Sequence, residues 1–138
     1  MRAWPLNDPL RWIHGANLPW RFVFRVKRIH EAASSDDGHR VLVDRLWPRG
    51  VSKERAALDA WPKEVTPSDA LRRAFHAGIL DDDAFARRYR RELAASEEAH
   101  ATLEDLQLRA ADGAVTLLSA VKDPEGGHVA VLLDLLQE

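Results

Sequence analysis

Two short stretches of the sequence combine residue types that can bind an anion and transfer a proton. The first, residues 44–50, directly follows the apolar run of residues 41–43. Its charged residues stand where an apolar strand gives way to a turn, and packing alone does not require charge there. An arginine in such a turn can present its guanidinium fork to a carboxylate or a phosphate. We therefore expect Arg45 and Arg49 to bind a ligand, and Asp44 to serve catalysis by orienting a neighbouring group.

The second stretch, residues 122–128, carries Lys122, Asp123 and His128 around a pair of glycines. The glycines let the backbone approach a ligand closely. The helix expected just after them offers free N–H groups and the positive end of its dipole to an anion. We expect Lys122 to bind charge, and we expect His128 to be the proton-transfer residue, with Asp123 as a second catalytic carboxylate.

Each of these residues also has a purely structural interpretation. Asp44 can be one half of a structural ion pair, because such networks also perturb charges. Arg49 can be a solvated arginine. The second stretch can be an Asp-Pro turn followed by a histidine that caps a helix. The sequence leaves these alternatives open.

Composition excludes several kinds of chemistry. The chain of 138 residues has no cysteine, which excludes thiol chemistry, disulfides and cysteine-bound zinc. Its six histidines are scattered without the spacing of metal ligands, so we expect no metal site, and no particular cofactor is indicated. The net charge of −2 argues against nucleic acid as the main partner, because that affinity comes largely from neutralising phosphates. The arginines of residues 87–91 are interpreted mainly as a solvated helix face, and a nucleic-acid accessory role is the weakest hypothesis.

The charged stretches must be positioned by strands and helices. Residues 22–29, 40–46 and 114–121 read as strands, and residues 66–76, 81–110 and 129–136 read as helical. Apolar strands separated by helices predict a single α/β domain over residues 22–138, with a mainly parallel sheet and helices on both faces. Ligands of such sheets bind beyond the carboxyl ends of the strands. If residues 41–45 and 115–120 are parallel neighbours, the two charged stretches meet there.

The most clearly marked helix of the sequence begins near Thr66. Thr66 is predicted as its N-cap, followed by Pro67 at the first helical position and by Asp69 near the positive end of the dipole. The helical period turns Arg72 and Arg73 outward.

Residues 1–21 form a separate extension rich in tryptophan and proline. Trp4, Trp12 and Trp20 supply three of the five tryptophans of the chain. We expect at least two of these rings to be buried, on this chain or on a second copy in a homo-oligomer. A binding or regulatory module that acts through this arm without chemistry is the alternative to a site for a small anionic ligand. No apolar run reaches transmembrane length and no signal peptide is evident, so we expect no membrane partner and a cytoplasmic location.

Residues 41–50 also resemble the signature of a known family. They are similar to the bacterial DUF488 family (domain of unknown function 488), in its YeaO-like branch. The similarity extends over roughly residues 24–137 and includes Trp61, Lys122, Asp123 and His128. The resemblance implies a compact α/β domain without an established activity.

Two positions of the chain depart from the family pattern. Members similar to this chain usually have Tyr where Ser119 stands and Asn where Gly127 stands. The resemblance therefore implies a crevice that lacks an aromatic ring and an amide. More distant branches carry cysteines near this region, and a chain without cysteine cannot share a thiol mechanism.

Overall fold

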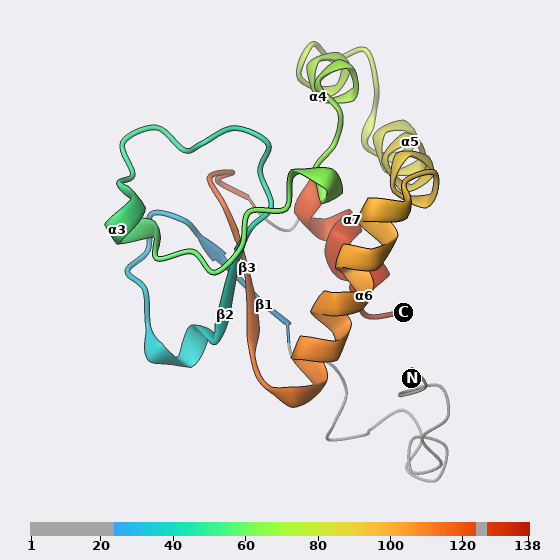
Figure 1. The fold of residues 1–138 in the computed structure, drawn as a ribbon. Coiled ribbons are helices and arrows are strands. Elements are labelled where there is room, and N and C mark those ends of the chain that lie inside the picture. Colours follow the sequence, from blue (N-terminus) through green and yellow to red (C-terminus); the bar gives the residue numbers. More distant parts are fainter. Residues whose placement is uncertain (1–23, 124–126) are drawn as a thin grey trace, which may run out of the picture.

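Three parallel strands lie at the centre of the computed structural model, which describes residues 24–123 and 127–138 (Figure 1). The strands are β1 (Phe24–Arg28), β2 (His39–Leu42) and β3 (Val115–Ser119), in the order β1-β3-β2. The helices are α3 (Lys53–Ala56), α4 (Asp69–His76), α5 (Asp82–Ala94), α6 (Glu97–Asp112) and α7 (Gly127–Leu136), with the 3-10 helices η2 (Ser35–Asp37) and η3 (Lys63–Val65).

The central strand β3 is buried along its whole length. Its Leu117 is paired with Val26 of β1 on one side and with Val41 of β2 on the other, both in parallel register. The prediction that the second and third strands are parallel neighbours is therefore confirmed. Burial on both faces explains why β3 is an almost continuous apolar run rather than an alternating one.

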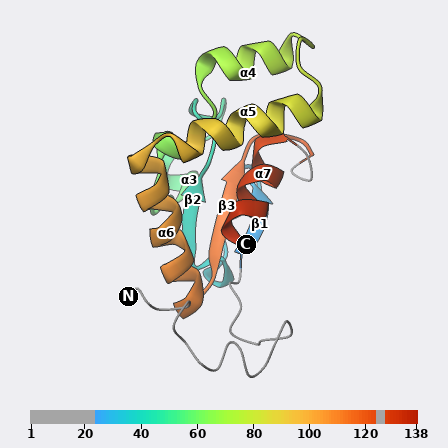
Figure 2. The ribbon, with the colours of Figure 1, turned by 90° about the vertical axis from the view of Figure 1, so that its right-hand side faces the viewer.

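Helices cover the two faces of the sheet unequally, as Figures 1 and 2 show. On one face Val41 and Leu117 belong to the larger core cluster, together with residues of α5, α6 and α7. On the other face Leu42 and Leu118 pack against Ala56 of the short helix α3 and its neighbouring loops. The predicted fold, a single α/β domain with a parallel sheet and helices on both faces, is confirmed.

A largely buried ion network joins β1 to the start of β2 through Asp37. Asp37 accepts hydrogen bonds from Arg40 and from Lys27, whose Nζ lies 3.0 Å from Oδ1. Arg40 Nη2 also donates to the carbonyl oxygen of Ala56 at 2.7 Å. The carbonyl of Asp37 accepts a bond of 2.7 Å from Thr116 of β3. Because every charged group of this network has partners, the network stabilises the fold and is not a candidate ligand site.

Three expected boundaries differ from the structure. Strand β2 ends at Leu42 instead of residue 46, because the chain then turns away to form the loop that carries Asp44. The N-cap of α4 is Ser68, whose Oγ accepts from the N–H of Leu71, whereas Thr66 donates its hydroxyl to a carbonyl of η3. The expected long helical region divides into α5 and α6 near Ser96, which caps α6. The arm of residues 1–21 lies outside the described residues.

Helix α4 stands beyond the carboxyl ends of the strands, and Figures 1 and 2 both show it packed along α5. Phe75 of α4 stacks on Phe85 of α5 with ring centroids 4.2 Å apart. At the start of α4, the N–H of Ser68 donates to Glu92 of α5 at 2.9 Å. These contacts hold α4 at the end of the sheet where α/β proteins bind ligands.

Candidate functional site

Asp44 is the centre of a hydrogen-bond cluster just past the end of β2. Its carbonyl oxygen accepts a bond of 2.7 Å from the indole N–H of Trp61, which fixes the turn. Its Oδ1 accepts from Ser119 Oγ at 2.7 Å and lies 2.8 Å from Nε2 of His128. Its Oδ2 accepts from the N–H of Ala120 at 2.8 Å. Thus the loop after β2, the end of β3 and the first turn of α7 meet at one carboxylate.

The ionised carboxylate of Asp44 is stabilised where it lies. Burial opposes ionisation and by itself would raise the pKa of Asp44, but the hydrogen bonds from His128, Ala120 and Ser119 outweigh it and lower the pKa below 3.8. An ionised Asp44 can only accept, so Nε2 of His128 carries the proton in the Asp44–His128 pair. In the neutral ring, Nδ1 is then the nitrogen that takes up a proton.

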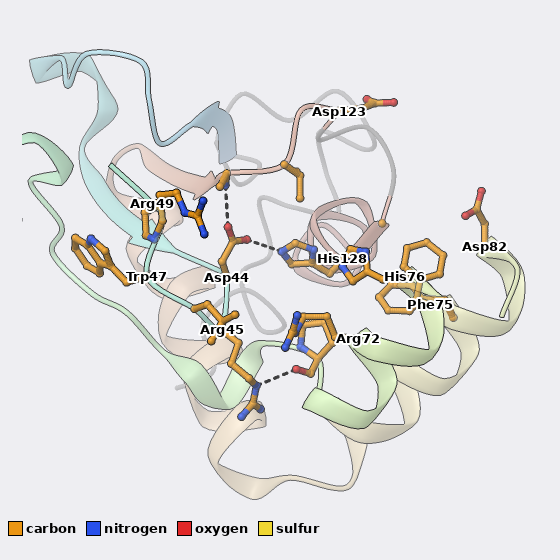
Figure 3. Close-up of a pocket in the computed structure, with 17 residues that line it drawn as sticks. Asp44, Arg45, Trp47, Arg49, Arg72, Phe75, His76, Asp82, Asp123 and His128 are labelled. Atoms are coloured by element: carbon orange, nitrogen blue, oxygen red, sulfur yellow. Dashed lines mark hydrogen bonds and ion pairs between the residues drawn. The ribbon is translucent and has the colours of Figure 1, made fainter. Parts of the chain in front are cut away.

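A pocket of about 590 Å³ opens beside this pair (Figure 3). Polar side chains line it from several elements, including Asp82 of α5 and Asp123 of the loop after β3. The loop after β2 contributes Asp44, Arg45 and Arg49, helix α4 contributes Arg72 and His76, and the first turn of α7 contributes His128. Apolar side chains complete the walls: Leu46, Trp47, Pro48, Pro67, Phe75, Phe85, Ala120 and Val121. The volume is that of a site for a small molecule.

The pocket brings together most of the residues expected from the sequence. Asp44, Arg45, Arg49, Asp123 and His128 all line it. The Arg45 side chain turns to the protein, where Nε donates to the carbonyl oxygen of Pro67 at 3.0 Å and so connects the loop to the start of α4.

Lys122 was expected to converge with Arg49 and His128, but it is exposed and is not part of the pocket lining. Asp44 and Arg45, which fall within the expected strand of residues 40–46, both lie in the loop beyond β2.

Sequence reasoning missed the wall formed by α4. The helical period predicted that Arg72 lies outside the core, whereas Leu71 of the same helix is buried in it. That outer side of α4 nevertheless faces the pocket, because the helix stands beyond the sheet instead of lying flat on it. The second omission is Ser119, which is 1% exposed. Its departure from the family pattern places a hydroxyl on Asp44.

Within residues 24–123 and 127–138, no group of three or more His, Asp and Glu side chains is arranged to hold a metal ion. None of the helices in those residues combines the length and the apolar character that crossing a membrane requires.

The fold and the site define a small parallel α/β domain with a carboxylate–imidazole pair and arginines in a pocket at the strand ends. The chain belongs to the DUF488 family: residues 23–138 match the family model described as "Inactive DUF488-N3 subclade". The expected resemblance to this family and to its YeaO-like members is confirmed by the relatives.

The relatives are themselves uncharacterised. The uncharacterised protein YeaO of Escherichia coli K12 is 44% identical over 111 residues, which is 80% of this chain and 94% of the relative. The uncharacterised protein Rv3073c of Mycobacterium tuberculosis H37Rv is 40% identical over 112 residues, 81% of this chain and 92% of the relative. No solved structure matches the chain.

Proposed function

We propose that this protein binds a small organic anion in the pocket between the strand ends and α4, without transforming it. One observation carries the proposal. Arg49 lines the pocket and has no hydrogen bond or ion pair with any residue that the structure describes, while both oxygens of the nearby carboxylate Asp44 are engaged by protein donors. The cation is therefore available to a ligand, and the anion is not.

The other polar groups of the pocket support the same ligand. His128 is held by Asp44 through Nε2, so its ring is fixed in the pocket wall, and when Nδ1 is protonated it adds a donor. Gly127 and His128 belong to the first turn of α7, where backbone N–H groups and the positive end of the helix dipole favour an anion.

The apolar walls require an organic body on the ligand. An inorganic phosphate or sulfate would fill only a small part of about 590 Å³ and would leave the Phe75 and Val121 side chains facing water. A ligand with an apolar group covers these side chains and gains the corresponding hydrophobic free energy, about 25 cal/mol per Å² of apolar surface.

Two observations favour binding without chemistry. Ser119 is the hydroxyl residue at this cluster, but it is buried and donates to Asp44 rather than to the imidazole of His128. It is therefore not arranged as a nucleophile activated by a histidine base. The word "Inactive" in the description of the matching family points the same way. An enzyme in which Asp44, His128 and Asp123 act catalytically is the alternative, and turnover of a bound ligand would establish it.

The test is a ligand-induced shift of the melting temperature with small aromatic carboxylates and phosphates. We expect a saturable increase, since a ligand at 100 times its Kd adds about 2.7 kcal/mol to the free energy of unfolding. Arg49→Ala should abolish the increase. Lys122→Ala is the matched control, because it removes a cation close in sequence but outside the pocket lining, and it should keep the increase. An increase that survives Arg49→Ala, or is lost equally in both variants, would contradict the proposed site.

We further propose a cytoplasmic location and association of two copies through the arm of residues 1–21. Removing the arm should then shift the protein to the monomer in sedimentation experiments. An unchanged mass after truncation would rule out the arm as the interface.

A further inference from the structure

We infer that the anionic group of the ligand is a phosphate monoester, held between Arg49 and Arg72 from opposite walls of the pocket. This inference rests on the proposed function and adds the ligand class and a second binding residue. It depends on the pairing of Arg72, on the directions of the two arginines and on the charges around them.

Arg72 is poorly paired in this structure. Its single ion pair with a described residue joins Nη2 to Asp69 Oδ1 at 3.3 Å, and the Asp69 side chain is 52% exposed. Such a pair contributes little free energy. Nε of Arg72 is buried and has no hydrogen-bond acceptor among the described residues. Because a buried donor without an acceptor costs free energy, a turn of the guanidinium toward an anion in the pocket is favoured.

The two arginines approach the pocket from different sides. Figure 3 shows Arg49 extending from the loop after β2 and Arg72 extending from α4, each with its guanidinium directed inward, and His128 between the walls. A carboxylate has two oxygens in one plane, which suit one guanidinium fork. A phosphate monoester has three oxygens that point in different directions, so it can accept from both arginines and from His128 together.

The charges of the pocket also match a dianion. The ionised carboxylate of Asp44 is already engaged by hydrogen bonds from Ser119, from the Ala120 N–H and from His128. Asp82 and Asp123 lie at the edge of the pocket, and Figure 3 shows their carboxylates directed away from Asp44 and His128. The two arginines thus bring two positive charges to the interior. A phosphate monoester carries about −1.5 to −2 at pH 7, whereas a carboxylate carries a single negative charge.

The experiment compares probes that share an apolar body and differ in their charged group: phenyl phosphate, benzoate and benzyl alcohol, with inorganic phosphate as the probe without a body. Binding to the full chain is measured by isothermal titration calorimetry at pH 7.5. We expect phenyl phosphate to bind at least about tenfold more tightly than benzoate and than inorganic phosphate, and benzyl alcohol to bind most weakly. Benzoate has only two oxygens in one plane for the two arginines, inorganic phosphate lacks the apolar body, and benzyl alcohol lacks the charge.

Variants assign the contacts. Arg49→Ala and Arg72→Ala should each weaken phenyl phosphate binding at least about tenfold, while Arg73→Ala, which removes the neighbouring exposed arginine of α4, should leave it unchanged. Arg72→Lys keeps the charge but not the fork, so it should recover only part of the loss. Circular dichroism of each variant checks the fold, and Arg72→Gln replaces Arg72→Ala if the latter does not fold.

The outcomes separate this inference from the proposed function. Equal affinity for benzoate and phenyl phosphate, still dependent on Arg49, would overturn the phosphate class and keep the organic-anion site. Full affinity in Arg72→Ala and Arg72→Gln would remove Arg72 from the site. Failure of every anionic probe to bind would overturn the proposed function itself.

Discussion

Asp44→Asn should lower the free energy of unfolding by about 2–4 kcal/mol. The carboxylate accepts from Ser119 and His128 on one oxygen and from the Ala120 N–H on the other. The amide of asparagine can offer its oxygen to only one of these sides and places its NH₂ group against the donors on the other. One or two donors thus lose their acceptor at about 1–3 kcal/mol each, and the remaining bonds are no longer to a charged acceptor.

The loss should depend on pH in a direction set by the pKa of Asp44. That pKa is lower in the folded protein than in the unfolded chain, so the carboxylate stabilises the fold fully above the unfolded-state pKa of about 3.9. The stabilisation disappears as the pH falls through the lower folded-state pKa. Urea denaturation at pH 7 and at successive values below pH 4 should therefore show the difference between wild type and Asp44→Asn narrowing in acid.

The matched control for this prediction is Asp82→Asn. Asp82 also lines the pocket, but it is exposed in the first turn of α5, so its replacement should change the free energy of unfolding by less than about 1 kcal/mol. Equal stability of wild type and Asp44→Asn at pH 7, or a difference between them that widens in acid, would refute the reasoning about the Asp44 cluster.

Three further substitutions test the fold. Gly38→Ala should lower the free energy of unfolding in chemical denaturation by about 3–5 kcal/mol, because φ of Gly38 is +64° and the new Cβ would lie 2.2 Å from the carbonyl oxygen of Ala114. The control is Gly113→Ala, whose Cβ would meet no atom within 4 Å and which should leave the free energy of unfolding nearly unchanged. Ala57→Gly should raise the melting temperature, with a gain of about 0.5–1 kcal/mol, because Ala57 ends α3 in the left-handed region at φ 46°. Asp37→Ala should cost about 3–5 kcal/mol in urea denaturation, because it leaves two cations without their shared partner. Wild-type stability of this last variant would mean that the ion network around Asp37 does not stabilise the fold.

The parts of the fold that follow from local pattern could be predicted from the sequence. The apolar runs of β2 and β3, with helices between them, predicted parallel neighbours, and the register of Val41 with Leu117 confirms this. The rule that strand ends meet at one edge then placed Asp44 near His128, and the structure joins them across 84 residues of sequence. Neither step needed knowledge of the side-chain packing.

The remaining parts depended on how whole elements are placed in space. The helical period predicted that Arg72 points away from the core. It could not predict that α4 stands beyond the sheet, where the side of the helix that carries Arg72 forms a wall of the pocket. The direction of Lys122 depends on the course of the chain just after β3. Ser68 and Thr66 are both favoured N-cap residues by type. The structure uses Ser68 as the cap of α4, and the N–H of Ser68 also donates to Glu92 of α5. These features depend on tertiary contacts between residues far apart in the sequence, which local sequence patterns do not reveal.

The strand order has a consequence for synthesis of the chain on the ribosome. Both β1 and β2 pair with β3, so neither completes its ladder until residues 115–119 have emerged. At about 5–20 residues per second, the 77 residues from the end of β2 to the end of β3 (119 − 42) take about 4–15 s to translate. Through that interval the nascent chain carries apolar strands with unpaired edges, which is the kind of segment that chaperones bind.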